Sequence, residues 1–228
     1  YHQIPDLKQN DEHRLEELQS YIAWESDTIK RADVCYWIKK LQNYPLQINL
    51  PYQSSLLDIT KPRTNAKLYK LDDILYADVK RLTMELGCSI FEIFRTVWAL
   101  LICEYSDQNK VVITYPVNMR RGKDKRVKGA LLNSCLFPFE KTGSFRSSID
   151  ILKQDKRDIN RYYVNIVELL SHLKNSAFSC AISQADLLIK GPVLEDAPGY
   201  QFGIELGSAD LCMFFNAADS FLQFGIVS

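Results

Sequence analysis

Residues 89–117 read SIFEIFRTVWALLICEYSDQNKVVITYPV, and this stretch decides the fold class of the chain. Ser89 and Glu92 have the spacing of a capping box, and the apolar run behind them predicts a helix over residues 91–105. A helix this apolar has to be buried on most of its sides. Residues 110–117 follow after a short turn, and their β-branched and aromatic side chains predict a buried strand. The stretch therefore indicates a helix packed on a β-sheet.

The same patterns continue on both sides of this stretch. Apolar residues at helical spacing predict further helices at residues 11–25, 27–41, 72 or 73 to 86, 144–160 and 165–173. A second buried strand is predicted at 130–139, and alternating residues predict further strands at 66–70, 178–183, 200–206, 211–216 and 221–227. Helices alternating with strands, followed by consecutive strands, predict an α/β (α+β) fold with a mixed β-sheet flanked by helices.

The composition limits the possible functions. The chain has 228 residues, of which 46% are hydrophobic and 25% charged, as expected for a folded domain. Its 28 basic residues balance its 28 acidic residues, so the overall charge favours neither nucleic acid nor an anionic membrane as a partner. The longest apolar run, residues 97–103, is far shorter than the roughly 20 residues that cross a bilayer. No signal peptide is recognised at the start, and a cytoplasmic location is expected.

Two further features concern the cysteines and the ends of the chain. The six cysteines stand singly among mostly apolar neighbours, which predicts buried thiols in a reducing compartment and neither a disulfide framework nor a zinc site. The chain opens at Tyr1 without an initiator Met and closes in strand-like sequence. We therefore expect it to be a piece of a longer protein.

Three segments, in this order along the chain, carry a resemblance to a known family. Residues 21–25 (YIAWE), 36–41 (YWIKKL) and 50–51 (LP) are similar to the family pattern Y-x-x-W-E … Y-W-x-x-x-L … L-P. Residues 112–120 (VITYPVNMR) resemble v-x-i-G-x-P-x-x-x-R, and residues 127–134 (VKGALLNS) resemble G-x-F-V-N-T. These patterns are typical of the condensation domains of nonribosomal peptide synthetases, which have a chloramphenicol-acetyltransferase-like fold. The resemblance covers nearly the whole chain.

The resemblance implies that residues 1–228 form the C-terminal subdomain, or second lobe, of such a domain. In the family, an acceptor amine attacks a carrier-bound thioester in a tunnel between two lobes, and an amide bond forms. The catalytic H-H-x-x-x-D-G motif belongs to the N-terminal lobe and is not found in this sequence. The chain by itself is therefore expected to be inactive, with no catalytic residue and no metal site of its own.

The resemblance also implies the partners of the chain. They are the N-terminal lobe of the same domain, peptidyl or acyl carrier proteins, and the adenylation domain of the same synthetase. No cofactor is expected to bind directly, but the phosphopantetheine arm of the carrier proteins would enter the tunnel. Neither nucleic acid nor a membrane is expected as a partner.

Four residues are candidates for the tunnel wall: Asn133, Ser134, Ser183 and Gln184. Asn133 lies in a predicted strand among apolar neighbours and needs a hydrogen-bond partner. It can approach the tunnel or bond to the backbone across the lobe junction, and the sequence leaves both possibilities open. Ser183 and Gln184 end a predicted strand, a position where polar residues are also common without any function.

A basic loop between two predicted strands is the candidate for carrier docking. It contains Arg120, Arg121, Lys123 and Arg126. These side chains could contact an acidic helix of a carrier protein or the phosphate of its arm. The alternative is an ordinary solvated loop.

The sequence departs from the family at a second motif. The pattern H-Q-D-x-P-F-E should fall near residues 161–168, which read RYYVNIVE, so only Glu168 is retained. His172 follows on the same predicted helix and is expected to be an ordinary surface histidine. Two other functions stay open: an ester-forming, acyl-CoA-dependent acyltransferase of the same superfamily, and a non-catalytic module that recruits partner enzymes.

Overall fold

The computed structural model describes residues 7–28, 31–50, 66–118, 132–173, 180–184, 211–217 and 222–227. The helices are α1 (Leu7–Thr28), α2 (Arg31–Leu41), α3 (Asp73–Leu86), α4 (Ile90–Ser106), α5 (Phe145–Arg161) and α6 (Ile166–His172). The strands are β1 (Ala66–Lys70), β2 (Lys110–Asn118), β3 (Leu132–Glu140), β4 (Cys180–Gln184), β5 (Leu211–Ala217) and β6 (Leu222–Val227).

The described strands form one mixed sheet in the order β1-β6-β5-β4-β2-β3. β4 runs parallel to both β2 and β5, and the remaining neighbours are antiparallel. This sheet, with helices packed on it, confirms the predicted fold class. Among the described strands, β1 and β3 lie at the two edges of this sheet.

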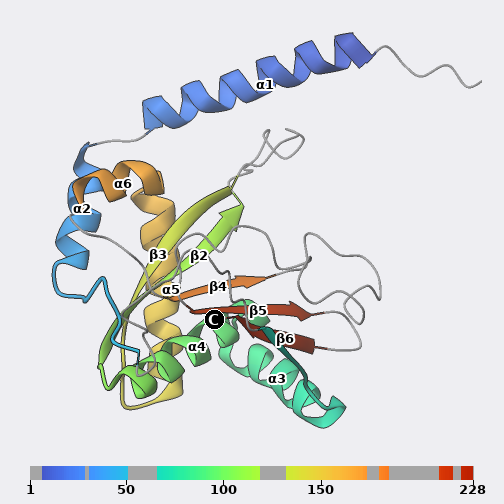
Figure 1. Ribbon diagram of the computed structural model, residues 1–228, viewed down its shortest axis with the longest axis vertical. Coiled ribbons are helices and arrows are strands. Elements are labelled where there is room, and N and C mark those ends of the chain that lie inside the picture. The colour runs from blue at the N-terminus through green and yellow to red at the C-terminus, as the bar shows by residue number, and fades with distance from the viewer. Residues whose placement is uncertain are drawn as a thin grey trace, which may run out of the picture.

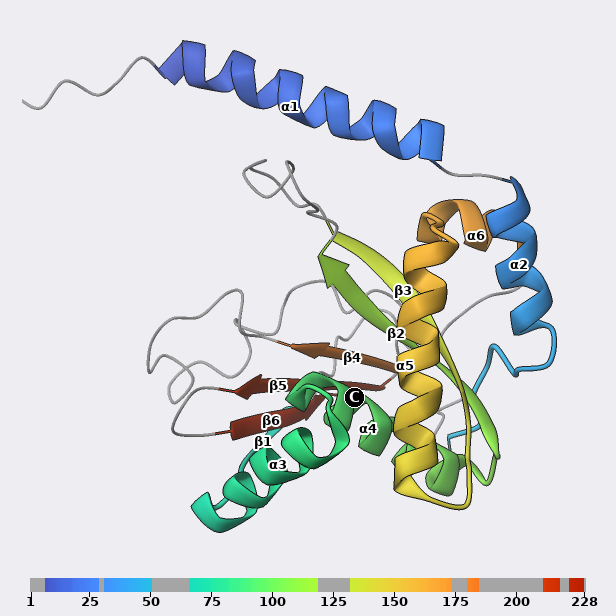
Figure 2. The ribbon, with the colours of Figure 1, turned by 180° about the vertical axis from the view of Figure 1, so that it is seen from behind.

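The helices α3, α4 and α5 lie against one face of the sheet, which is the nearer face in Figure 2. α4 is the apolar helix of the opening stretch, and Trp98, Ala99 and Ile102 on it are buried. In β2, Val111, Val112 and Ile113 are all fully buried, so both faces of the sheet are covered at this point. Phe137 and Phe139 of β3 pair with two of these residues and complete the centre of the core.

Local signals at the helix ends are confirmed. Ser89 accepts a hydrogen bond from the backbone of Glu92, and the Glu92 carboxylate accepts one from the backbone of Ser89, which is the predicted capping box. Asp72 caps α3, which ends at Gly87 in the left-handed conformation (φ 60°). Ser144 and Asn165 cap α5 and α6.

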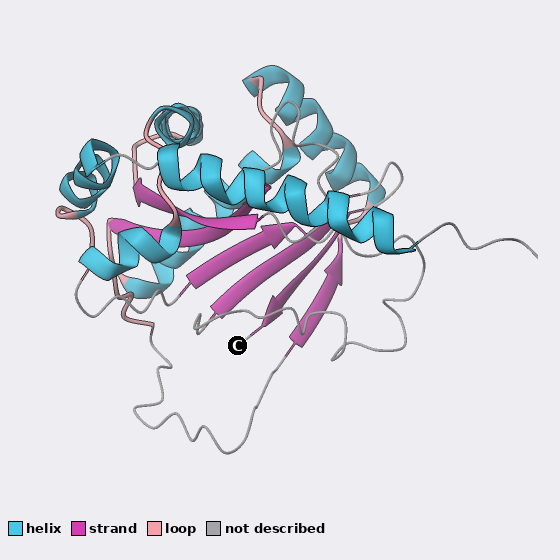
Figure 3. Cartoon of the chain, turned by 90° about the horizontal axis from the view of Figure 1, so that it is seen from above, coloured by secondary structure: helices cyan, strands magenta, loops and turns pink. Residues whose placement is uncertain are grey.

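α1 lies apart from the helices that cover the sheet and runs beyond the ends of β2 and β3 (Figure 1), so it crosses in front of the sheet when the molecule is seen from above (Figure 3). It contacts the body through a small cluster in which Tyr21 packs on Tyr163, with Leu18 and Val117 beside them. α1 continues to Thr28, so the prediction that the second helix starts at residue 27 is wrong, and α2 starts at Arg31. The helical period continues past residue 25, and the sequence contains no proline or glycine that would mark the break.

The cysteines, one predicted strand and the apolar helices remain to be compared with the predictions. All six cysteines are free, as predicted, and four of them are buried, but Cys35 is exposed on α2. The strand predicted at residues 200–206 lies outside the described residues, as does most of the connection before it. No single helix within the described ranges is long and apolar enough to cross a membrane. α3 and α4 together pass that test by length and composition, but they meet at a bend of 100°.

Candidate functional site

One side of the β2–β3 hairpin is exposed near the ends of its strands. Pro116 pairs with Ser134, and Asn118 pairs with Leu132, so each pair lies on the same face of the sheet. All four side chains are exposed, and Leu132 has 54% of its surface accessible. We call Pro116, Asn118, Leu132 and Ser134 the exposed strip. It offers the hydroxyl group of Ser134 for hydrogen bonding beside the apolar side chain of Leu132.

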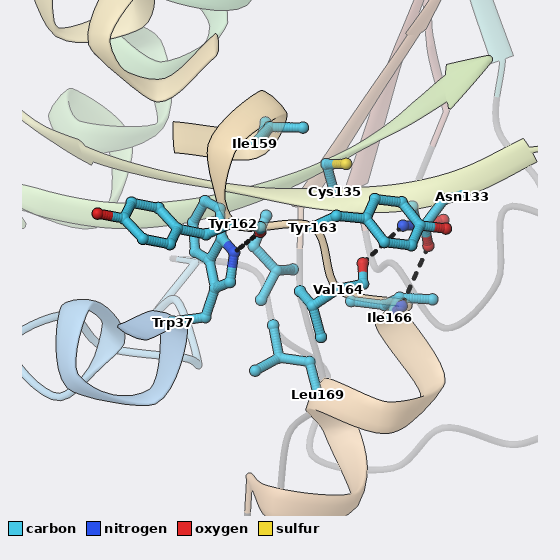
Figure 4. Close-up of a pocket in the computed structure, with 11 residues that line it drawn as sticks. Trp37, Asn133, Cys135, Ile159, Tyr162, Tyr163, Val164, Ile166 and Leu169 are labelled. Carbon is cyan, nitrogen blue, oxygen red and sulfur yellow. Dashed lines mark hydrogen bonds between the residues drawn. The ribbon is translucent and has the colours of Figure 1, made fainter. Parts of the chain in front are cut away.

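The neighbouring residue Asn133 lies on the opposite side of β3. Its side chain is only 5% exposed, because successive residues of a strand point to opposite faces. The Asn133 Nδ2 atom donates to the carbonyl of Val164 at 2.8 Å, and its Oδ1 atom accepts from the backbone of Ile166 at 3.1 Å (Figure 4). Both groups of the amide are therefore occupied by backbone. The structure places Asn133 in a structural contact and Ser134 on the exposed strip.

The segment that departs from the family motif connects α5 to α6. We call residues 162–165 the junction. The indole nitrogen of Trp37 donates to the carbonyl of Tyr162 at 2.7 Å, and Tyr36 stacks on the Tyr162 ring with centroids 3.8 Å apart. Tyr163 is buried and its hydroxyl donates to the Glu25 carboxylate. Burial and this negatively charged partner raise the pKa of Tyr163, so it is a hydrogen-bond donor and not a base.

A pocket opens between α2, β3 and the junction (Figure 4). Its empty volume is about 360 Å³, part of which is open to solvent. The lining is mostly aromatic and aliphatic, and Asn133, the amide in it, is already paired with backbone. Little of the pocket volume is enclosed, and among the described residues the lining has no nucleophile beside a base and no paired acid and base. The lining residues are Trp37, Asn133, Ser134, Cys135, Leu136, Ile159, Tyr162, Tyr163, Val164, Ile166 and Leu169.

A buried ionic network lies between the hairpin and the helices. Arg95 of α4 is 3% exposed and Asp155 of α5 is 1% exposed, and their charged groups are 3.6 Å apart. The Tyr115 hydroxyl donates to Asp155 at 3.1 Å, and Lys40 of α2 is 3.7 Å from it. Burial raises the pKa of Asp155 although Arg95 and Lys40 oppose the shift. These groups are packed away from the exposed strip, so they hold elements together and are not placed to meet a substrate.

Sequence reasoning missed this network. A signal was present, because Asp155 stands on the same helical stripe as the buried residues Ile149, Leu152 and Ile159. A carboxylate on an apolar stripe needs a buried partner. Arg95, a charged residue within the apolar helix α4, was the corresponding signal for the partner of Asp155.

The remaining candidates are placed as follows. His172 is an exposed surface histidine, as predicted, 3.3 Å from Glu168 on the same helix face. Ser183 and Gln184 lie in β4 opposite Phe214 and Phe215 of β5, although the structure does not describe their side chains. The candidates for carrier docking, Arg120, Arg121, Lys123 and Arg126, lie outside the described residues, in the segment that joins β2 to β3. Among the described side chains, no group of His, Cys, Asp and Glu could hold a metal ion.

Parts of two peptide synthetases are similar in sequence to this chain. No family model matches the chain. Gramicidin S synthase 2 of Brevibacillus brevis is 23% identical over 177 residues, which are 73% of this chain and 4% of that protein. Bacitracin synthase 3 of Bacillus licheniformis is 24% identical over 162 residues, which are 68% of this chain and 2% of that protein.

Solved structures cover still more of the chain. The first condensation domain of the calcium-dependent antibiotic synthetase, in complex with a substrate analogue, superposes with a TM-score of 0.70 at 12% identity. The match covers 93% of this chain and 50% of that one. The chain has the condensation-domain fold. The condensation domain of the monacolin K polyketide synthase matches similarly, with a TM-score of 0.67, 11% identity and coverage of 93% and 54%.

The condensation-domain fold confirms the resemblance predicted from the sequence. The chain spans about half the length of these solved condensation domains and a few per cent of the synthetases it matches. Within this fold, the junction occupies the stretch that departs from the second family motif. Its residues make packing contacts instead of presenting polar groups.

Proposed function

We propose that this chain is the second lobe of a nonribosomal peptide synthetase condensation domain and that its exposed strip forms one wall of the substrate tunnel. The observation that carries the proposal is the match of 93% of the chain to half of a condensation domain. A tunnel between two lobes needs an exposed face on each of them. The exposed strip supplies such a face, with the Ser134 hydroxyl beside apolar surface.

The proposed reaction is amide formation between two carrier-bound substrates. The acceptor amine attacks the thioester carbonyl carbon, a C–N bond forms, and the C–S bond breaks. The amine proton passes through a general base to the leaving thiolate, and such a base contributes about 10²–10⁴-fold. That base belongs to the other lobe in this proposal. The role of this chain is to bind and orient the phosphopantetheine arms, with Ser134 as a hydrogen-bonding group.

Blocking the exposed strip tests the proposal in the complete synthetase. We expect Ser134→Trp to abolish product formation from carrier-loaded substrates, because the indole would fill the tunnel beside the strip. Carrier affinity should not change, since carriers dock outside the tunnel. Ser171→Trp, at an exposed position of α6, is the matched control and should leave turnover unchanged. Full turnover by the Ser134→Trp protein would refute the tunnel wall.

Carrier docking at the basic loop is a separate part of the proposal. Charge reversal at Arg120, Arg121 and Arg126 should weaken carrier binding, and the effect should be larger at low salt because exposed charges are screened by ions. Unchanged affinity at low salt would remove the loop from the docking surface. Lys123 belongs to the same loop and should act in the same direction.

A non-catalytic recruitment module is the second candidate. The observation in its favour is that the junction, in place of the family motif, is occupied by packing contacts with α1, α2 and β3. The two functions differ in the first lobe of the complete protein. An intact H-H-x-x-x-D-G motif there, together with product formation, supports the condensation reaction. A motif that lacks its second histidine supports recruitment.

A further inference from the structure

Three successive residues of the junction are each held by a different element. The carbonyl of Tyr162 accepts from Trp37 of α2, the hydroxyl of Tyr163 donates to Glu25 of α1, and the carbonyl of Val164 accepts from Asn133 of β3. These partners are 125, 138 and 31 residues away in the sequence. Helix ends are usually satisfied by local caps or water. This one ties together three distant parts of the chain.

The contact with β3 matters because β3 is an edge strand. Its inner side pairs with β2 over nine residues, and on its outer side no further strand pairs with it among the described residues. Asn133 ties this edge strand to the junction from one face of the sheet, since its amide bonds both a carbonyl and a backbone N–H group of the segment 164–166. Ser134 is the next residue of the strand and points to the exposed side. The amide of Asn133 therefore fixes the backbone from which Ser134 projects.

The contact with α1 reaches the other strand of the hairpin. The Tyr163 ring is 5.6 Å from that of Trp24 and packs with Tyr21, and Val117 of β2 packs against the same cluster. Val117 lies between Pro116 and Asn118, two residues of the exposed strip. Tyr163 thus links α1 to the end of β2.

We infer that Asn133 and Tyr163 are positioning residues, which hold the ends of β2 and β3 and keep the exposed strip in the geometry that the substrates need. The inference rests on the proposed function. Neither residue touches the substrates: Asn133 acts through Ser134, and Tyr163 acts through Val117 and its neighbours. A tunnel wall that shifts by about 1 Å can cost up to roughly 100-fold in rate, because the reacting groups are no longer aligned.

The test uses the complete synthetase and compares two variants with a control. Asn133→Leu removes both amide bonds, and Tyr163→Phe removes only the hydroxyl that donates to Glu25 while it keeps the ring in the cluster. We expect kcat to fall about tenfold or more in Asn133→Leu and severalfold in Tyr163→Phe. The KM for carrier-bound substrates should change less than about twofold, because the docking surfaces are intact. Asn160→Leu, at an exposed position of α5, should change neither constant.

Hydrogen exchange gives a readout that does not depend on condensation. Amides at the start of β3 should exchange faster in Asn133→Leu, and amides of α1 should exchange faster in Tyr163→Phe. Faster exchange with unchanged kcat would overturn the inference, because the junction would then have only a structural role. An equal loss of kcat in the Asn160→Leu control would overturn it as well. If the parent synthetase forms no amide at all, the proposed function fails and the inference falls with it.

Discussion

The buried carboxylate of Asp155 has three partners from three elements. Arg95 comes from α4, Tyr115 from β2 and Lys40 from α2, and each lies within 3.7 Å of it. The Arg95 guanidinium also lies over the rings of Tyr115 and Phe137, at 4.1 and 4.4 Å. The Nε atom of Arg95 and the Oδ1 atom of Asp155 have no hydrogen-bond partner. The hydrogen bonding of the ion pair is therefore incomplete. Each buried charge is compensated only while the other charge is present.

Breaking this pair from one side should destabilise the fold. We expect Asp155→Asn to lower the free energy of unfolding by about 3 kcal/mol, because it leaves the Arg95 charge buried without a counter-charge. The double variant Asp155→Asn with Arg95→Met should recover most of that loss. Urea unfolding of the 228-residue chain and its variants measures both effects. If Asp155→Asn alone is as stable as the parent, the Asp155 carboxyl is already neutral in the folded protein.

The carboxylate of Asp158, one helical turn away, should make stability depend on pH. Burial opposes its ionisation, but hydrogen bonds from Lys40, Tyr36 and Gln154 outweigh burial and lower its pKa. A carboxylate with a lowered pKa stabilises the fold above about pH 4, the ordinary value for aspartate. This contribution is lost as the pH falls through the lowered pKa.

Comparison with Asp158→Asn isolates this effect. The parent should be more stable than the variant near neutral pH, and the difference should shrink below about pH 4. Asp155 has a raised pKa and acts in the opposite direction. The Asp158 charge contributes to that shift, so Asp158→Asn also lowers the pKa of Asp155, and the measured difference includes this change. Unfolding curves at several pH values give the difference. A difference that does not change with pH would contradict the assignment.

Helices α3 and α4 begin and end where their local signals place them. α3 ends at Gly87, whose φ of 60° is in the left-handed region, and α4 begins two residues later at the capping box of Ser89 and Glu92. The two helices therefore meet at a sharp bend of 100° with a defined stop and start. This bend lets α4 enter the core while α3 stays on its surface.

Gly87→Ala should destabilise the end of α3 by about 1–2 kcal/mol, because a side chain disfavours the left-handed backbone. No atom lies within 4 Å of the position of the new Cβ, so a clash cannot account for the loss. Gly143→Ala is the matched control, since its Cβ is also unhindered and its backbone has no positive φ. Thermal unfolding should separate the two variants. Equal melting temperatures would argue against a conformational cause.

The molecule as a whole exposes apolar side chains on α1 and at the end of the hairpin. Leu15 and Ile22 of α1 and Leu132 of β3 each have more than half of their surface accessible. Faces between domains of one chain bury roughly 600–1,500 Å². In the proposed function, the first lobe covers this side of the molecule.

We expect the isolated chain to fold, to bind a hydrophobic dye and to self-associate, since this apolar surface has no cover. Ile22→Ser combined with Leu132→Ser should lower dye fluorescence, and adding the first lobe to the parent should do the same. Ile74→Ser, which removes a still more exposed side chain from α3, is the control and should have little effect. A sharp monomer without dye binding would weaken the proposal of a second lobe.

The sequence by itself determined the elements, their caps and the class of the fold. These features follow from local sequence patterns, such as the capping box of Ser89 and Glu92 and the β-branched run at the start of β2. The three segments that resemble condensation domains added the family of the fold. The break between α1 and α2 was misplaced because no local signal marks it.

Only the tertiary structure decided which side each candidate faces and what the junction does. Asn133 and Ser134 are adjacent in the sequence, yet one is committed to backbone contacts and the other lies on the exposed strip. The contact of Tyr163 with Glu25 and the network around Asp155 join residues far apart in the chain. Such contacts depend on how helices and strands pack in space. A pattern along the sequence does not tell which distant residues this packing brings together.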